Sequence, residues 1–190
     1  MPWFLLEVRL RPDRAKAHFV LGRALSSLGR SREAAEHYRR AFALEPGDME
    51  ACGALAMSLA RAGGAHDAVA QMEECLRRWP QDARLRNNLA SLLILDNRPQ
   101  EALAQLAESV RLDTGYALGR FNLSVALLHA GRVEDGVREL VRAYRDAGAD
   151  EALRRRILAR ARALAGSEQG ALRESVRSSH DPALNVLIGP

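Results

Sequence analysis

Apolar residues recur along this chain at the spacing of amphipathic helices. In residues 17–28 the apolar side chains lie three or four positions apart, which places them on one face of a helix. Gly29 ends this helix, because glycine accepts a positive φ, and Ser31 is placed to cap the next one. A second apolar face then runs to Pro46, which cannot continue a helix. The pattern predicts an antiparallel pair of helices in residues 15–48.

The same outline returns every 34 residues. The aligned positions are Leu21, Leu55, Leu89 and Leu123; Leu25, Leu59, Leu93 and Leu127; Ala34, Ala68, Ala102 and Gly136; Gly29, Gly63, Asn97 and Gly131; and Pro12, Pro46 and Pro80. One helix pair cannot bury its apolar faces alone, so neighbouring pairs must stack to form a continuous core. The period therefore predicts a helical repeat protein.

The spacing within the first copy resembles the tetratricopeptide repeat (TPR). It contains His18-x2-Leu21-Gly22-x2-Leu25, Ala34-x3-Tyr38 and Pro46, at the repeat length of that family. The resemblance covers roughly residues 1–150 and implies an all-α, right-handed superhelical solenoid of antiparallel helix pairs. The expected segments are a half-repeat or N-terminal cap helix (1–14), four repeats (15–48, 49–82, 83–116 and 117–150), C-terminal capping helices (151–178) and a tail (179–190).

Both ends of the chain carry apolar residues that allow more than one interpretation. Residues 1–14 align with the second half of a repeat, so they are either a natural cap or part of a longer array cut at this point. The apolar Trp3 and Phe4 favour the second explanation, because a cap should have a polar outer face. In the tail, the apolar run 184–188 is either disordered or folds into a groove of its own chain or of a neighbour. Self-association through the tail or the N-terminal helix is therefore one expectation.

Composition narrows the function classes. The net charge is +4 with a pI near 9.7, but the basic excess lies at the two ends of the chain, and aromatic residues make up only 5%. Nucleic-acid binding usually needs a concentrated basic face with aromatic stacking partners, so this function is not favoured. No apolar run is long enough to span a membrane, and residues 1–10 lack the cleavage site of a secretory signal. The chain is expected in the cytoplasm, unless it is a fragment of an exported protein.

The two cysteines, Cys52 and Cys75, fall in the same repeat. They lie near the start of its first helix and the end of its second, positions that an antiparallel pair brings together. For a cytoplasmic chain we expect two buried, unpaired cysteines, and a disulfide or redox pair is the alternative.

No group of residues in the sequence indicates catalysis. The five histidines have no metal-ligand spacing to cysteine or to each other, and the sequence contains no nucleophile-elbow, phosphate-loop or dinucleotide motif. The sequence therefore predicts that the chain is not an enzyme and that it binds no cofactor and no metal.

The resemblance places a ligand groove on the first helix of each repeat. TPR proteins bind peptides or partner helices along the concave wall that these helices form. The matching positions are Lys16, Phe19, Arg23, Met57, Arg61, Arg84, Asn87, Asn88, Ser91, Phe121, Asn122, Val125 and His129. This set is the predicted groove.

The predicted groove contains three kinds of side chain. The amides of Asn87, Asn88 and Asn122 both donate and accept hydrogen bonds, so they suit a peptide backbone, and equally a neighbouring repeat or water. The cations suit an acidic side chain or a C-terminal carboxylate. The apolar residues of the C-terminal half suit an amphipathic helix or an apolar peptide, or belong to the core between helices.

These features favour a protein-interaction scaffold that binds a peptide or helix of a partner protein in its groove. One alternative is a regulatory or targeting module of a larger enzyme, such as the TPR portion that accompanies some bacterial glycosyltransferases. A weaker alternative is an RNA-associated helical-repeat protein, whose binding would fall steeply with salt.

Overall fold

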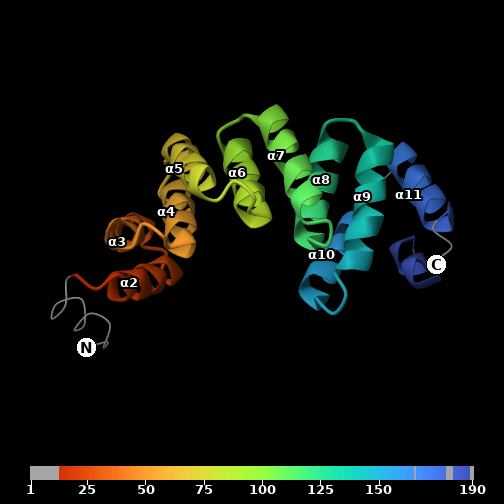
Figure 1. The fold of residues 1–190 in the computed structure, drawn as a ribbon. Coiled ribbons are helices and arrows are strands. Elements are labelled where there is room, and N and C mark those ends of the chain that lie inside the picture. Colours follow the sequence, from red (N-terminus) through yellow and green to blue (C-terminus); the bar gives the residue numbers. More distant parts are fainter. Residues whose placement is uncertain (1–12, 165, 179–181, 189–190) are drawn as a thin grey trace. The chain divides into compact units, whose positions relative to one another are not determined.

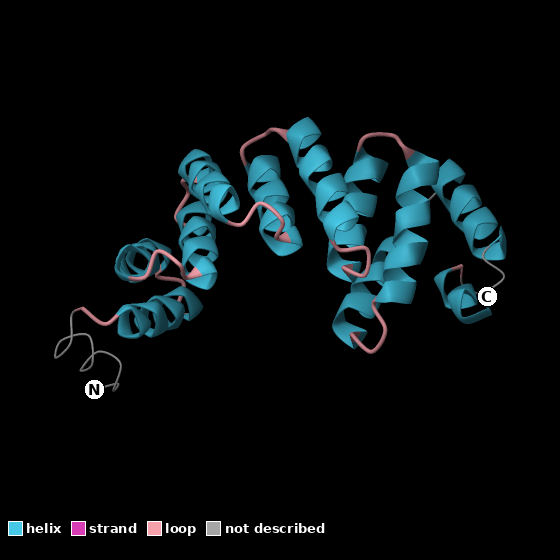
Figure 2. Cartoon of the chain, in the orientation of Figure 1, coloured by secondary structure: helices cyan, strands magenta, loops and turns pink. Residues whose placement is uncertain are grey.

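In the computed structural model, residues 13–164, 166–178 and 182–188 are described, and every regular element in these ranges is a helix (Figure 1, Figure 2). The predicted repeats are numbered 1 to 4 in chain order. Their first helices are α2 (Ala15–Ser27), α4 (Met49–Arg61), α6 (Ala83–Leu95) and α8 (Ala117–His129). The second helices are α3 (Ser31–Leu44), α5 (Ala65–Arg78), α7 (Pro99–Leu112) and α9 (Val133–Asp146). They are followed by α10 (Glu151–Arg162), α11 (Gly166–Ser178) and the short 3₁₀ helix η1 (Pro182–Leu187). Successive first helices begin 34 residues apart, so the prediction of an all-α helical repeat fold is confirmed.

The chain divides into two compact units. Unit 1 is Met1–Arg98 and contains α2 to α6, and unit 2 is Pro99–Pro190 and contains α7 to α11 and η1. The boundary falls between α6 and α7, inside the predicted third repeat. The half-repeat predicted in residues 1–14 lies almost wholly outside the described residues. None of the helices in the described ranges has the length and apolarity needed to cross a bilayer.

The turns inside the repeats have the backbone conformation that the sequence predicts. Gly63 has φ +95° and Asn97 has φ +58°, the left-handed region where glycine and asparagine are tolerated. The aligned Gly29 and Gly131 have φ values of +74° and +75°. This aligned turn residue therefore ends the first helix of every repeat.

Aspartates begin three of the helices. The side chains of Asp48, Asp82 and Asp150 accept hydrogen bonds from the backbone N–H groups of Ala51, Leu85 and Leu153, at 3.0, 2.7 and 2.9 Å. Each bond satisfies an N–H group that has no partner inside the helix. The expected cap at Ser31 is wrong, because Arg30 occupies the cap position of α3 and Ser31 is already helical.

In unit 1, close packing within repeat 1 depends on a small residue at the contact between α2 and α3. An added Cβ at Gly22 would lie 3.0 Å from two ring atoms of Tyr38. The absence of a side chain at Gly22 therefore makes room for the aromatic ring. Leu21, Leu25 and Leu55 belong to the same buried cluster as Tyr38.

In unit 2, the C-terminal helices cover the last repeat. Both α10 and α11 contact α9, and η1 contacts α9, α10 and α11. Leu184 and Leu187 of η1 are almost completely buried, in the same cluster as Leu140 of α9 and Ile157 of α10. The described part of the apolar tail is therefore folded against its own unit.

Candidate functional site

The predicted groove residues of unit 1 lie on three helices, α2, α4 and α6. Lys16 and Arg23 of α2, Arg61 of α4 and Arg84 of α6 are exposed. Phe19, Met57, Asn88 and Ser91 are partly buried, and only Asn87 is buried, with 4% of its surface exposed. Most of the set in this unit is therefore accessible to a ligand.

Two of these cations lie near one phenol. Burial raises the pKa of Tyr38, and the charges of Arg23 and Arg61 oppose that rise. Glu50 acts on the same group in the opposite direction to the arginines. The charges of Arg23 of α2, Arg61 of α4 and the acidic Glu50 therefore all act on the hydroxyl of Tyr38.

Of the four cations in the predicted groove of unit 1, one is hydrogen-bonded to a neighbouring helix and three are not. Arg61 donates from Nη1 to Ser26 Oγ at 2.9 Å, a contact between α4 and α2, and it lines a cavity of about 310 Å³ with Arg30 and Arg32. Within the part of the chain that the structure describes, the side chains of Lys16, Arg23 and Arg84 make no hydrogen bond or ion pair. These three charges are available to an external group.

The two neighbouring asparagines of α6 have different surroundings. Asn87 is buried and already bonded, and its backbone oxygen accepts a hydrogen bond from Ser91 Oγ at 3.2 Å. The side chain of Asn88 is partly exposed and makes no hydrogen bond to the described residues. Asn88 is thus the amide of unit 1 that can bond a ligand without breaking an existing contact.

In unit 2, the predicted groove residues take part mainly in packing. Phe121 is only 7% exposed, and the guanidinium of Arg156 on α10 lies 5.0 Å from the centre of its ring. Val125 packs against the buried cluster, and Asn122 already has a partner. His129, at the end of α8, is exposed. The capping helix α10 therefore covers the aromatic residue that the sequence offered to a ligand.

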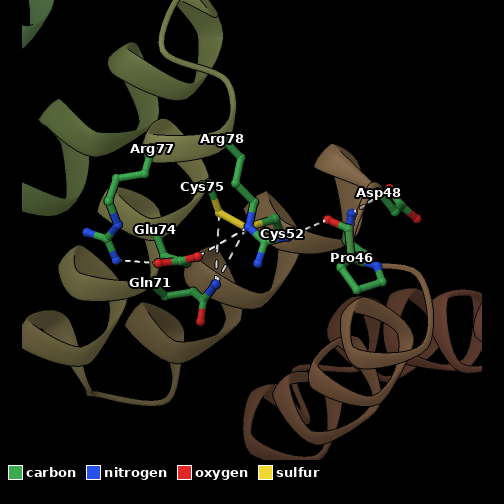
Figure 3. The surroundings of a disulfide bond; sticks show 9 residues. Pro46, Asp48, Cys52, Gln71, Glu74, Cys75, Arg77 and Arg78 are labelled. Carbon is green, nitrogen blue, oxygen red and sulfur yellow. Dashed lines mark hydrogen bonds and ion pairs between the residues drawn. A yellow bond between two sulfur atoms is a disulfide. The ribbon is translucent and has the colours of Figure 1, made fainter.

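The two cysteines form a disulfide, which corrects the expectation that they are unpaired (Figure 3). Cys52 of α4 and Cys75 of α5 are completely buried, and their Cα atoms are 5.9 Å apart. The antiparallel helices turn the two side chains toward each other, which the spacing in the sequence allowed but did not determine. Gln71 Nε2 lies 3.5 Å from Cys52 Sγ.

The described residues include no group of three or more His, Cys, Asp or Glu side chains that could hold a metal ion. The expectations that the chain has no metal, no cofactor and no enzymatic activity stay predictions.

Comparisons with solved structures find the same fold. A thermophilic TPR protein from Thermus thermophilus is 20% identical, with 82% of this chain and 86% of that chain covered and a TM-score of 0.70. YrrB, described as a TPR protein with an unusual peptide-binding site, is 18% identical, with coverage of 95% and 94% and a TM-score of 0.62. A fragment of MamA from Desulfovibrio magneticus RS-1 is 16% identical, with coverage of 76% and 81% and a TM-score of 0.65.

Comparison with curated protein sequences gives no significant match. Family models described as tetratricopeptide repeat match residues 15–48, 54–117 and 97–152. These matches cover more than half of the chain and extend over helices α2 to α9. The chain therefore belongs to the tetratricopeptide repeat family.

Proposed function

We propose that this chain is a protein-interaction module that binds an acidic peptide segment of a partner protein along the first helices of unit 1. The observation that carries the proposal is the set of exposed cations without partners among the described residues, namely Lys16 and Arg23 of α2 and Arg84 of α6. An extended peptide that crosses α2, α4 and α6 would meet these charges in turn.

The balance of charge on this face favours an acidic ligand. The predicted groove of unit 1 contains four cations. One exposed carboxylate, Glu50, occupies in α4 the position that Lys16 and Arg84 occupy in α2 and α6, so the cations outnumber it. Many other arginines are already neutralised by an acid one turn away, as Arg30 is by Glu33 and Arg111 is by Glu108. A carboxylate ligand would therefore gain more from Arg23 or Arg84 than from an arginine that is already paired.

The remaining accessible side chains suit the rest of a peptide. The amide of Asn88 can donate to a backbone carbonyl and accept from a backbone N–H group. Phe19 and Met57, which are partly exposed, offer apolar surface to alternate side chains of an extended segment. Binding of this kind involves no covalent chemistry, and its strength depends on how rigidly the helices hold the contact residues.

A test uses fluorescently labelled peptide pools of acidic, neutral and basic composition, titrated with the full chain. We expect the acidic pool to bind most tightly, and Arg23→Ala and Arg84→Ala to weaken its binding by about two- to fivefold each. The matched control is Arg39→Ala with Arg40→Ala, which removes two exposed charges from α3, outside the predicted groove. Equal losses in the control, or equal binding of the three pools, would contradict the proposal. Preference for labelled RNA over the acidic peptides would favour the RNA-associated alternative.

A further inference from the structure

The fourth residue of each first helix, and of α10, follows the 34-residue period, but its identity differs between repeats. We call it the link position, because its side chain joins the helix to neighbouring segments. This link position is His18 in α2, Cys52 in α4, Arg86 in α6, Arg120 in α8 and Arg154 in α10, each 34 residues after the one before. It lies in the first turn of the helix or just after it. The surroundings of this position show what each residue does there.

Arginine at the link position ties its helix to the loop before it. Arg120 donates to the backbone oxygen of Thr114, six residues earlier, from Nη2 at 2.7 Å and from Nε at 3.1 Å. Arg86 and Arg154 repeat this contact with the oxygens of Pro80 and Gly148, at 2.8 and 3.2 Å.

In repeat 4 the same arginine also ties the two helices of the pair together. Arg120 of α8 forms ion pairs with Glu139 and Asp146 of α9, at 2.7 and 2.6 Å. These side chains are largely buried, so the ion pairs are less screened by solvent than pairs on the surface. The link in repeat 4 therefore joins the loop, the first helix and the second helix.

In repeat 2 two different groups make these connections (Figure 3). Cys52 occupies the link position, and its disulfide with Cys75 joins α4 to α5 covalently. The backbone oxygen of Pro46, again six residues earlier, accepts a hydrogen bond from Arg78 Nη1 at 3.0 Å. The disulfide thus stands where repeat 4 has a buried ion pair.

The disulfide fixes the open end of its helix pair. At one end, α4 and α5 are joined by the turn at residues 62–64. Cys52 lies near the start of α4 and Cys75 near the end of α5, so the disulfide joins them toward the other end. Both cysteines are completely buried, so a reductant reaches the sulfur atoms only when the two helices separate.

We propose that the Cys52–Cys75 disulfide is a redox-controlled lock on repeat 2. A dithiol reductant supplies the two electrons. Its thiolate attacks one cysteine sulfur, the other sulfur leaves as a thiolate, and the second thiol of the reductant then displaces the first cysteine. The products are two cysteine thiols and one oxidised reductant.

Reduction leaves repeat 2 with a weaker link than repeat 4. Two thiols carry no charge and are poor hydrogen-bond partners, so they cannot replace the ion pairs of Arg120. Repeat 2 then opens more often, whereas repeat 4 is unaffected. Since disulfides persist in oxidising compartments and are rare where thiols are kept reduced, the compartment sets the state of the lock. The lock does not depend on which ligand the chain binds.

Hydrogen exchange of the full chain, before and after reduction with dithiothreitol, tests the lock. Intact mass after alkylation of the denatured protein first establishes the state of both cysteines. We expect amides in residues 49–78 to exchange at least about tenfold faster in the reduced protein. Amides in residues 117–146, which contain no cysteine, should change by less than about twofold.

A matched variant transplants the link of repeat 4 into repeat 2. It combines Cys52→Arg, Gln71→Glu, Cys75→Ala and Arg78→Asp, the residues found at the aligned positions Arg120, Glu139, Ala143 and Asp146. Dithiothreitol should leave its exchange in residues 49–78 unchanged. The wild-type comparison decides the proposal even where this variant does not fold. Equal exchange of residues 49–78 in the oxidised and reduced wild type would overturn it, as would failure of the two thiols to form a disulfide when the reduced protein is incubated with oxidised glutathione.

Discussion

At the scale of single residues, the contact between His18 and His37 makes repeat 1 sensitive to pH. Their Nδ1 atoms are 2.9 Å apart, so one nitrogen donates while the other must be unprotonated to accept. Burial lowers the pKa of His37, and the charge of His18 lowers it further, whereas Glu36 and Glu33 act in the opposite direction. The folded protein therefore favours a neutral ring at His37.

This contact predicts that repeat 1 loses stability in mild acid. Because the pKa of His37 in the folded state lies below the usual histidine value of about 6.5, the unfolded chain binds this proton first as the pH falls. The contribution to the free energy of unfolding should be complete above about pH 6.5 and be lost as the pH falls through the lower folded pKa. Urea titrations over this range measure it. His37→Gln, which copies the aligned Gln71, should remove most of this dependence. An unchanged pH profile in the variant would contradict the assignment.

The turn conformations could be predicted from the sequence, because they depend only on which residues tolerate a positive φ. The turn residues at positions 29, 63, 97 and 131 need a positive φ, and the sequence places glycine or asparagine at each. The sequence shows less clearly which small residue on one helix packs against which large side chain on the next. Gly22 faces the large Tyr38, whereas the aligned positions of repeat 2 hold Ala56 and Met72. The sequence showed that position 22 is small, and the structure shows which ring requires it.

The candidate site was harder to predict than the turns, because the period does not fix the rotation of a helix within its stack. Asn87 and Phe121 occupy the same position of their helices, and both are buried. Asn88, one residue further on, is partly exposed. The disulfide could not be predicted for the same reason. The spacing of Cys52 and Cys75 allowed a pair, but pairing also required both side chains to point toward each other across the helix contact.

At the scale of elements, the short helix η1 acts as a cap for unit 2. Leu184 is 1% exposed and packs in the cluster formed with α9, α10 and α11, whereas Val186 of the same helix is 45% exposed. Leu184→Ala should therefore destabilise unit 2 by about 2–5 kcal/mol, because it leaves a cavity. Val186→Ala should cost less than about 0.5 kcal/mol. Urea unfolding followed by circular dichroism compares the two, and similar losses in both variants would show that η1 does not pack as described.

At the scale of the whole molecule, the two units should respond differently to reductant. Both cysteines and both tryptophans, Trp3 and Trp79, lie in unit 1, so tryptophan fluorescence reports on unit 1 alone while circular dichroism reports on the helices of both units. The disulfide closes a ring between residues 23 positions apart, which should stabilise the folded state by about 3 kcal/mol.

Dithiothreitol should accordingly lower the urea midpoint seen by fluorescence by about 1–3 M. The transition seen by circular dichroism should then separate into an early step from unit 1 and a later step from unit 2, because stability in a repeat protein is close to a sum of local terms. The variant Cys52→Ala with Cys75→Ala should reproduce the early step without reductant. A single transition that moves as a whole in both signals would mean that the disulfide stabilises the complete chain, and that the two units unfold cooperatively.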